Sequence, residues 1–340
     1  MMRLPRFRYL APGSVAEAAA ALADLGPEAA VLAGGTDLFP NMKRRQQTPA
    51  TVVALRGIAA LRARAIDPAR GLTLGALTRL SAIEHDAGIA AAWPALARAA
   101  SLVATPPLRN MGTIGGNLCL DTRCSYYDQS HEWRAAIGYC MKKEGETCWV
   151  APSSPRCWAV SSSDTAPVLC ALGAEVTLAS TAGERRIPAS ELFADDGIAY
   201  LTRRRDEILT SVHVPPPAEG ERSAYVKLRR RGSFDFPVLG VAVRARLDAG
   251  GTVTSASIFV GGTGSRPQEA RAAAELLTGR VLDAAAIREA AGLIAHIAKP
   301  MQNTDFTLGW RKAVAREYAA RALRELVAGN GAAANHASGS

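Results

Sequence analysis

The chain has 340 residues, and its 40 Lys and Arg outnumber its 31 Asp and Glu to give a formal net charge of +9 at pH 7. Hydrophobic residues make up 48% and charged residues 21%, an ordinary globular composition that excludes a largely disordered, collagen-like or coiled-coil chain. A chain of this length is expected to form two or three packed units, each with its own core.

The N-terminal sequence, the lack of a long apolar stretch and the distribution of basic residues argue against secretion, membrane insertion and nucleic-acid binding. The start, MMRLPRFRYLAPG, has no apolar run after its basic residues and therefore does not resemble a signal peptide. No stretch approaches the roughly 18 apolar residues of a membrane span, and the basic run from Arg229 to Arg231 is too short to indicate nucleic acid. We therefore expect a cytoplasmic protein that binds neither nucleic acid nor a membrane.

The first hundred residues predict short helices and strands joined by tight turns. Ser14 is placed to cap a helix over 15–25, which Gly26-Pro27 ends. The apolar run 29–33 predicts a strand, and the glycine loop after it leads to a short helix through 42–45. A strand over 72–77 and helices over 80–86 and 90–102 follow.

The region 105–163 has no clear periodicity, and so long a loop inside a compact domain usually signals a function or an unrecognised constraint. A helix over 164–172 and a strand over 174–179 follow it. The proline-rich run 215–220 predicts a linker. After it, strands over 240–247 and 252–260 precede helices over 267–277, 284–298 and 310–327, which is an α+β order. The small, polar tail 329–340 is expected to be disordered.

Five of the six cysteines lie within 39 residues of one another, at 119, 124, 140, 148 and 157. In a cytosolic chain such clustering favours metal binding or catalysis over disulfides. No CxxC pair is present, so common zinc ribbons fit poorly. The residues alone leave three readings open, namely an iron–sulfur cluster, zinc, or unrelated cysteines. We expect Cys170 to be a small buried hydrophobe, and Cys119 to be a buried thiol or a spare ligand.

Two glycine loops have the composition of a pyrophosphate-binding site, because glycine lets backbone N–H groups approach a phosphate closely. Neither is a Rossmann GxGxxG loop or a P-loop, and each could be an ordinary turn. The first consists of Val31, Leu32, Ala33, Gly34, Gly35, Thr36, Asp37 and Leu38. The second runs from 109 to 117 and contains Asn110, Gly112, Thr113, Gly115, Gly116 and Asn117.

The two loops together, VLAGGTDL followed by RNMGTIGGN, resemble the FAD-binding medium subunits of the molybdenum hydroxylase family, which includes xanthine dehydrogenase and carbon monoxide dehydrogenase. The family branch that also carries a cysteine segment is that of the 4-hydroxybenzoyl-CoA reductase beta subunit. Its segment is similar to this chain in NLCLDTRCSYY, CMKK and CWVAPSSPRCWAVSSSDTAPVL. The likeness covers essentially residues 5–328.

This resemblance implies an α+β fold, a two-lobed FAD-binding domain of the xanthine dehydrogenase medium-subunit type with an iron–sulfur insert and a C-terminal α+β domain. The corresponding boundaries are 1–214 for the FAD-binding domain, with lobes of about 1–56 and 57–214 and an insert of about 122–160, and 221–328 for the C-terminal domain. The implied FAD-binding residues are those named individually in the two loops, together with Asp121, Asp164 and Lys227. The implied [4Fe-4S] ligands are Cys124, Cys140, Cys148 and Cys157.

Three of these positions have alternative structural readings. Asp164 could cap the next helix, Lys227 could be a surface strand residue, and Thr78 could lie near FAD or cap a helix. Chain length supports the cluster independently, because Cys124 follows Asn117 by seven residues and Cys157 precedes Asp164 by seven. Seven residues reach at most roughly 25 Å, so both ends of the cysteine segment are tethered near the proposed flavin surface.

The resemblance implies an electron-transfer subunit with no catalytic residue of its own. Ferredoxin would donate electrons, and partner subunits would hold [2Fe-2S] clusters and a molybdenum-pterin cofactor, in a dimer of heterotrimers that removes the phenolic hydroxyl of 4-hydroxybenzoyl-CoA during aromatic degradation. The same fold could instead serve a hydroxylase for xanthine, an aldehyde or another aromatic substrate, with electrons flowing outward. A non-redox module with structural zinc is the third reading, and the paired glycine loops disfavour it.

Overall fold

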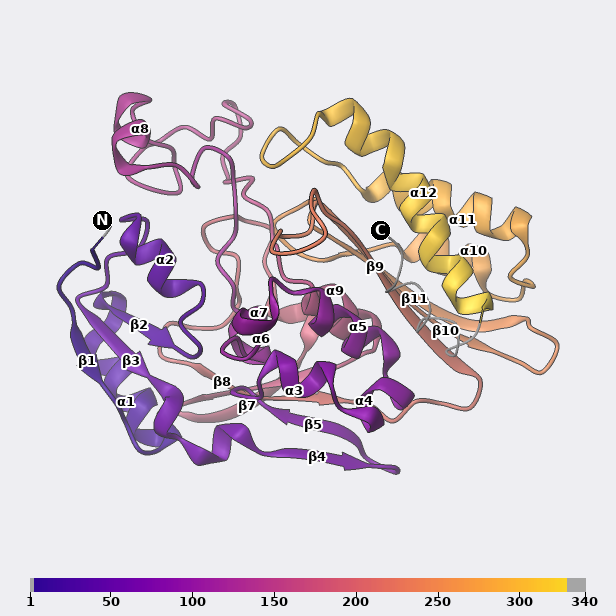
Figure 1. Cartoon of the computed structure of the whole chain (residues 1–340), viewed down its shortest axis with the longest axis horizontal. Coiled ribbons are helices and arrows are strands. Elements are labelled where there is room, and N and C mark those ends of the chain that lie inside the picture. The colour runs from indigo at the N-terminus through magenta and orange to yellow at the C-terminus, as the bar shows by residue number, and fades with distance from the viewer. Residues whose placement is uncertain (1–2, 329–340) are drawn as a thin grey trace.

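A computed structural model describes residues 3–328, so the predicted disordered tail lies outside the described residues. Figure 1 shows three layers along the long axis of the molecule, with the N-terminal lobe at one end, a central sheet with its helices in the middle, and the C-terminal domain at the other end. Within the described residues, no helix has the length and apolarity needed to cross a membrane.

The N-terminal lobe is built on a small parallel sheet of order β1-β3-β2 (Arg8–Leu10, Thr51–Ala54 and Ala29–Leu32). Helix α1 (Val15–Leu25) packs Ala18, Ala19 and Leu22 into its core. The Ser14 hydroxyl accepts a hydrogen bond from the Glu17 N–H at 3.1 Å, which is the cap that the sequence predicts. A cap of this kind fixes where the helix starts and therefore how it lies on the sheet.

Helix α2 (Leu38–Lys43) starts earlier than the predicted helix through 42–45. Its first turn forms directly from the glycine loop, because the Phe39 N–H donates to the Gly35 carbonyl at 3.2 Å. Pro40 is compatible with this position, since the first turn of a helix needs no N–H from it. The first glycine loop is therefore continuous with a helix, with no intervening turn.

The central sheet is antiparallel, of order β4-β5-β8-β6-β7 (Arg64–Asp67, Gly71–Gly75, Ile208–Val214, Glu175–Ser180 and Gly183–Pro188). Strand β8 lies between β5 and β6 in the sheet, although it follows both in the sequence. The sheet is therefore completed only by chain that comes after the cysteine region. The helices that lie around it are α3 (Leu80–Glu84), α4 (Ala87–Ala92), α5 (Pro94–Leu102), α6 (Pro106–Arg109), α7 (Ile114–Leu118) and α9 (Thr165–Ala171).

The helix predicted over 90–102 is two helices, α4 and α5. Pro94 starts the second, where proline needs no N–H partner, and Trp93 between them has non-helical backbone angles. The Trp93 indole donates to the Pro215 carbonyl at 2.9 Å, which ties this break to the proline-rich run after β8. Among the described residues, four short 3-10 turns lie at Gly26–Glu28, Leu55–Gly57, Ala59–Arg62 and Ala189–Leu192.

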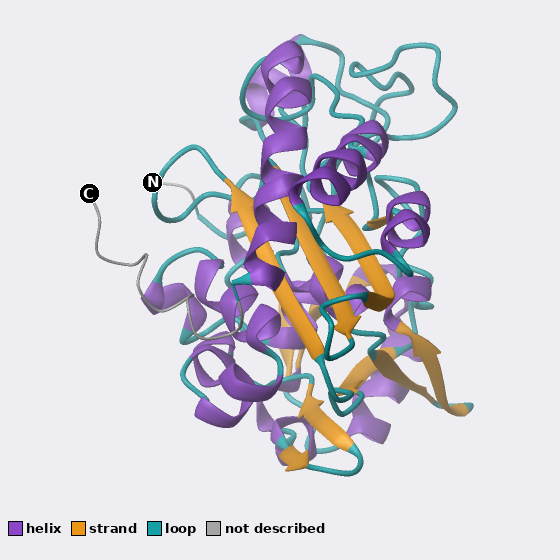
Figure 2. Cartoon of the chain, turned by 90° about the vertical axis from the view of Figure 1, so that its right-hand side faces the viewer, coloured by secondary structure: helices purple, strands orange, loops and turns teal. Residues whose placement is uncertain are grey.

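The C-terminal domain is an antiparallel sheet of order β12-β11-β10-β9 (Gln268–Glu269, Val253–Gly261, Leu239–Leu247 and Glu221–Leu228). One face packs on α10 (Arg271–Leu277), α11 (Ala284–Ile297) and α12 (Leu308–Val327), and Figure 2 shows these helices over the long strands. On the opposite face, Tyr225, Ala242 and Phe259 join the core of the central sheet. Because successive side chains along each strand point to opposite faces, the sheet packs on its own helices with one face and on the rest of the molecule with the other.

The region 105–163 is more ordered than its sequence suggests. It contains α6, α7 and α8 (His131–Ala136), and Figure 1 shows the part around α8 projecting beside the N-terminal lobe. A small core of Cys124, Tyr127, Cys157 and Ala159 lies within it. Hydrogen bonds fasten it to both ends of the molecule, from Arg134 to the Arg44 carbonyl at 2.9 Å and from the Asn303 amide to the Trp158 carbonyl at 2.7 Å.

Candidate functional site

A cavity of about 1010 Å³ lies between the N-terminal lobe and the central sheet and extends to the C-terminal domain. Every predicted FAD-binding residue except Asn110 and Lys227 lines it. The set comprises Val31, Leu32, Ala33, Gly34, Gly35, Thr36, Asp37, Leu38, Gly112, Thr113, Gly115, Gly116, Asn117, Asp121 and Asp164. Asn110 lines a smaller cavity next to it. Lys227 does not line the main cavity, but its ammonium donates a hydrogen bond to Asp164, which does.

The two glycine loops approach so closely that side chains are excluded between them. A Cβ placed on Gly34 would overlap the carbonyl oxygen of Met111 and lie 2.7 Å from its carbonyl carbon. A Cβ on Gly115 would lie 2.8 Å from that of Ala76. Gly35 has φ +76°, a conformation that favours glycine. The wall of the cavity here is therefore bare backbone, which suits a ligand with phosphate groups.

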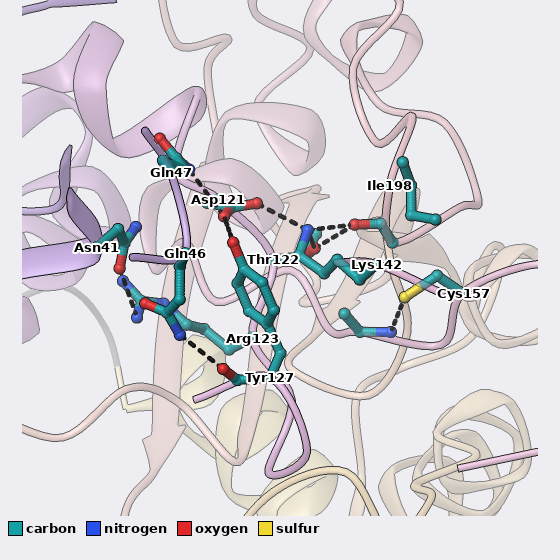
Figure 3. A network of polar contacts seen from close by, with 12 residues as sticks. Asn41, Gln46, Gln47, Asp121, Thr122, Arg123, Tyr127, Lys142, Cys157 and Ile198 are labelled. Atoms are coloured by element: carbon teal, nitrogen blue, oxygen red, sulfur yellow. Dashed lines mark hydrogen bonds and ion pairs between the residues drawn. The ribbon is translucent and has the colours of Figure 1, made fainter. Parts of the chain in front are cut away.

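Asp121 is the centre of a buried polar network, shown in Figure 3. One of its carboxylate oxygens accepts from the Gln47 amide at 2.9 Å and from the Tyr127 hydroxyl at 3.3 Å. The other accepts from the Lys142 ammonium at 2.8 Å. The Lys142 side chain is only 6% exposed. Since Tyr127 and Lys142 both belong to the cysteine segment, this segment contributes directly to a carboxylate that lines the cavity.

The Lys142 ammonium also donates two hydrogen bonds on the side that faces the cysteines. It donates to the Thr122 hydroxyl at 2.7 Å and to the Gly197 carbonyl at 2.6 Å. Gly197 in turn packs on Cys157, and a Cβ there would lie 2.7 Å from the Cys157 sulfur. The rings of Tyr127 and Tyr200 lie 5.0 and 5.3 Å from the ammonium, within range of a cation–π interaction.

Replacing Lys142 with Met is expected to destabilise the protein by about 3–5 kcal/mol, because it leaves the Asp121 carboxylate buried without its cation. Lys142→Arg keeps the charge and is expected to recover a large part of this loss. The measurement is the urea midpoint of each full-length variant. Equal midpoints for the Met variant and the wild type would show that Lys142 has no such role.

Arg123 makes a second link between the cysteine segment and the first glycine loop. Its guanidinium forms ion pairs with Asp37 and with Asp128, the latter at 3.2 Å. It also lies 4.5 Å from the ring centre of Phe236 in the C-terminal domain. Burial raises the pKa of Asp37, and the Arg123 charge opposes this effect. Arg123 thus connects three parts of the molecule at the cavity edge.

Asp164 and Lys227 form an ion pair at 2.8 Å in which the two side chains are 3% and 1% exposed. The Tyr225 hydroxyl donates to the other Asp164 oxygen at 2.8 Å. Burial raises the pKa of Asp164 and lowers that of Lys227, and each charge opposes this effect on its partner. The readings of Asp164 as a helix cap and of Lys227 as a surface residue are therefore wrong, since Asp164 makes no capping bond and Lys227 is buried.

Lys227→Met is expected to cost about 3–5 kcal/mol, because the buried Asp164 carboxylate would lose its cation. The double variant Asp164→Asn, Lys227→Met removes both charges and is expected to lose less stability than the sum of the single changes. Urea unfolding of the four proteins measures this coupling. Additive losses would mean that the two groups do not stabilise each other.

The four predicted cluster ligands are all buried, and they influence one another electrostatically. Burial raises the pKa of Cys124 to about 12, and the nearby Cys157 and Cys140 raise it too. Burial likewise raises the pKa of Cys157 to about 11, a value that Lys142 lowers and Cys148 raises. Buried thiols that share one neighbourhood, with a cation beside them, are suited to bind a positively charged centre once deprotonated.

These thiols do not form a site for a single metal ion. Across residues 3–328, no three His, Cys, Asp or Glu side chains come together closely enough to hold one. Zinc needs four ligands about 2.3 Å from one ion, whereas the ligands of an iron–sulfur cluster bind separate irons and can lie farther apart. The described residues therefore show no preformed metal site at these thiols.

Cys170, Cys119 and Thr78, which the sequence also singled out, lie in three different environments. Cys170 is buried in the apolar core of the central sheet, as expected. Cys119 is half-buried and lines the cavity, and burial raises its pKa. Thr78 does not cap a helix, because its buried hydroxyl has no hydrogen-bond partner. No pattern in the sequence indicated Gln47, Tyr127 and Lys142, because their hydrogen-bond partners are distant in sequence.

Comparison with known proteins gives matches over nearly the whole chain. Residues 5–217 match the family described as the FAD binding domain in molybdopterin dehydrogenase, and residues 223–326 match the CO dehydrogenase flavoprotein C-terminal domain. The carbon monoxide dehydrogenase medium chain of Afipia carboxidovorans is 30% identical over 294 residues, which cover 86% of this chain and 87% of that one.

Two further relatives are similar over almost their full lengths. The 6-hydroxypseudooxynicotine dehydrogenase complex subunit alpha of Paenarthrobacter nicotinovorans is 29% identical over 322 residues, 95% of each chain. A chain in the solved structure of carbon monoxide dehydrogenase from Hydrogenophaga pseudoflava is 28% identical and superposes with a TM-score of 0.78, covering 96% of this chain and 99% of that one.

Proposed function

Since the chain belongs to the FAD-binding medium subunits of the molybdenum hydroxylase family, we propose that it is the electron-transfer flavoprotein subunit of a molybdenum hydroxylase complex. The observation that carries this proposal is the cavity of about 1010 Å³ lined by both glycine loops. It is large enough for a dinucleotide, since ligand pockets commonly span about 300–1000 Å³.

The residues around the cavity fit FAD. Gly34 and Gly35 line the cavity with backbone alone, which suits the pyrophosphate, because backbone N–H groups can approach phosphate oxygens closely. The cavity reaches from Gly26 in the N-terminal lobe to Phe234 in the C-terminal domain, a span that an extended dinucleotide can follow. We propose that the lining residues named above hold the cofactor, with Asp164 and Lys227 close to its ring system.

We also propose that Cys124, Cys140, Cys148 and Cys157 hold a [4Fe-4S] cluster. The chemistry of the donors fits, because thiolates are the usual ligands of such clusters. The Lys142 ammonium donates to Asp121 on the cavity side, and its charge lowers the pKa of Cys157 in the proposed ligand set. When bound, FAD and the cluster would supply electron transfer, and the chain would provide position and charge.

The proposed partners are a large subunit with the molybdenum cofactor and a small subunit with [2Fe-2S] clusters, in a dimer of heterotrimers. The names of the relatives support such an assembly, since they are a medium chain and a subunit of a dehydrogenase complex. Substrate chemistry would take place in the large subunit. The cavity walls present no residue of this chain that we assign to substrate catalysis.

For the reaction itself, the comparisons favour a dehydrogenase with outward electron flow over the reductase that the sequence resemblance implied. Both curated relatives named above are dehydrogenases, of carbon monoxide and of 6-hydroxypseudooxynicotine. One observation keeps reductive dehydroxylation of 4-hydroxybenzoyl-CoA as a second candidate. It is the segment with four buried cysteines, which would suit a ferredoxin-driven supply of low-potential electrons.

Turnover assays of the purified complex separate the two reactions. Oxidation of an aldehyde, purine or N-heteroaromatic substrate with an artificial electron acceptor, and no turnover of 4-hydroxybenzoyl-CoA, would establish the dehydrogenase. Formation of benzoyl-CoA with reduced ferredoxin would establish the second candidate. A complex that lacks FAD and turns over neither substrate class would contradict the proposed function altogether.

A further inference from the structure

Residues 194–200 form a loop that lies between the large cavity and the cysteine segment. The loop is closed at its base, where the Ala194 N–H donates to the Tyr200 carbonyl at 2.9 Å. At its tip, the Asp196 carboxylate accepts from the Ile198 N–H at 2.6 Å, as in an Asx turn. These bonds hold the loop in one shape, so a shift of one of its faces is expected to shift the other.

The outer face of the loop is fastened to the cysteine segment through the backbone of Gly197. The Gly197 N–H donates to the Cys157 carbonyl at 3.0 Å. The Gly197 carbonyl accepts from the Lys142 ammonium at 2.6 Å and from the Thr122 hydroxyl. A Cβ on Gly197 would lie 2.8 Å from the backbone nitrogen of Ala159, so a residue with a side chain would keep the two backbones apart.

The inner face of the loop belongs to the wall of the cavity, which Ile198, Ala199 and Tyr200 all line. Ile198 is apolar and 47% exposed, so a ligand in the cavity can cover it, and burial of apolar surface is favourable. The loop therefore contacts the cysteine segment on one face and the space for FAD on the other.

We propose that the 194–200 loop couples FAD binding to the order of the cysteine segment, with Gly197 as the positioning residue. FAD in the cavity holds the inner face of the loop, and the loop in turn holds the backbone at Cys157 and Ala159. Such coupling is reciprocal, because a ligand that orders a segment binds more tightly when that segment is already ordered. The inference rests on FAD occupying the cavity, and it holds whether or not the four buried thiols carry iron.

Amide hydrogen exchange of the full-length chain, as purified and after removal of FAD, tests this coupling. We expect FAD to slow exchange in residues 140–159 about tenfold in the wild type and about twofold in Gly197→Ala. The added Cβ forces the loop away from Ala159 and so breaks the connection. Because the coupling is reciprocal, Gly197→Ala is also expected to bind FAD about fivefold more weakly.

Gly309→Ala is the matched control, because a Cβ there would meet open space and Gly309 lines neither of the two cavities described. It should show the protection and the FAD affinity of the wild type. Thr122→Val is a milder variant that removes one of the two side-chain donors to the Gly197 carbonyl, and we expect it to reduce the slowing to about fivefold. Helix α11 in the C-terminal domain is the reference for general stabilisation by FAD.

Three results would overturn the inference alone. One is FAD uptake with no slowing in residues 140–159. Another is equal slowing in α11, which would mean that FAD stabilises the whole chain. The third is tenfold slowing that persists in FAD-saturated Gly197→Ala or, if that variant does not fold, in Thr122→Val. A chain that takes up no FAD would instead contradict the proposed function, and this inference with it.

Discussion

Gly34→Ala is expected to weaken FAD binding about 100-fold, because overpacking between rigid groups costs about 1–3 kcal/mol. The added Cβ would overlap the Met111 carbonyl, which belongs to the backbone of the second glycine loop. Backbone cannot turn away as a flexible side chain can, so the two loops would have to separate. The cavity wall between them would then lose the shape that the phosphates require.

Gly57→Ala is the matched control for this change. A Cβ at Gly57 would meet its nearest atom, the Pro12 carbonyl oxygen, at 3.5 Å, which is an ordinary contact. Fluorescence titration of the two apoproteins with FAD gives the dissociation constants, and circular dichroism shows whether each variant is folded. Wild-type affinity in a folded Gly34→Ala protein would mean that the glycine loops do not hold the cofactor.

Cys148→Ser is expected to abolish iron binding and to leave FAD in place. The serine hydroxyl is a poor ligand for iron at neutral pH, and the three thiols that remain cannot complete the proposed set. The Cys148 side chain is buried, so loss of its bond to a cluster should also make the segment around it exchange its amide hydrogens faster. Iron per FAD and hydrogen exchange of residues 124–157 are the measurements.

Cys119→Ser provides the control, because Cys119 lines the cavity and is not in the proposed ligand set. It should keep the iron of the wild type. If Cys119→Ser loses iron and Cys148→Ser keeps it, the assignment of the ligands is wrong. If both keep it, the four buried thiols are not a cluster site.

The fold class could be predicted from the sequence, and the family matches and the solved structure confirm it. Local signals were sufficient where one residue fixes an element, as Ser14 does for α1. Pro94 also starts a helix, α5, but the single helix predicted over 90–102 did not take this signal into account. The resemblance to medium subunits added the arrangement of the parts. The iron–sulfur character of the cysteine segment remains a proposal.

Other elements could not be predicted, because partners distant in sequence determine them. Strands β4 and β7 lie at the two edges of the central sheet and consist largely of exposed residues, so neither shows an apolar alternation. The role of Lys142 depends on Asp121, which is 21 residues away, and on Gly197, which is 55 residues away.

The central claim is that one chain holds FAD and an iron–sulfur cluster on either side of the network formed by Lys142 and Asp121. The most direct measurement is an anaerobic absorption spectrum of the purified full-length chain together with flavin, iron and zinc analysis. We expect a brown protein with one FAD and roughly four irons per chain and no zinc. A flavin-free protein, or a purely yellow one whose four cysteines are free thiols or disulfides with no iron, would contradict it.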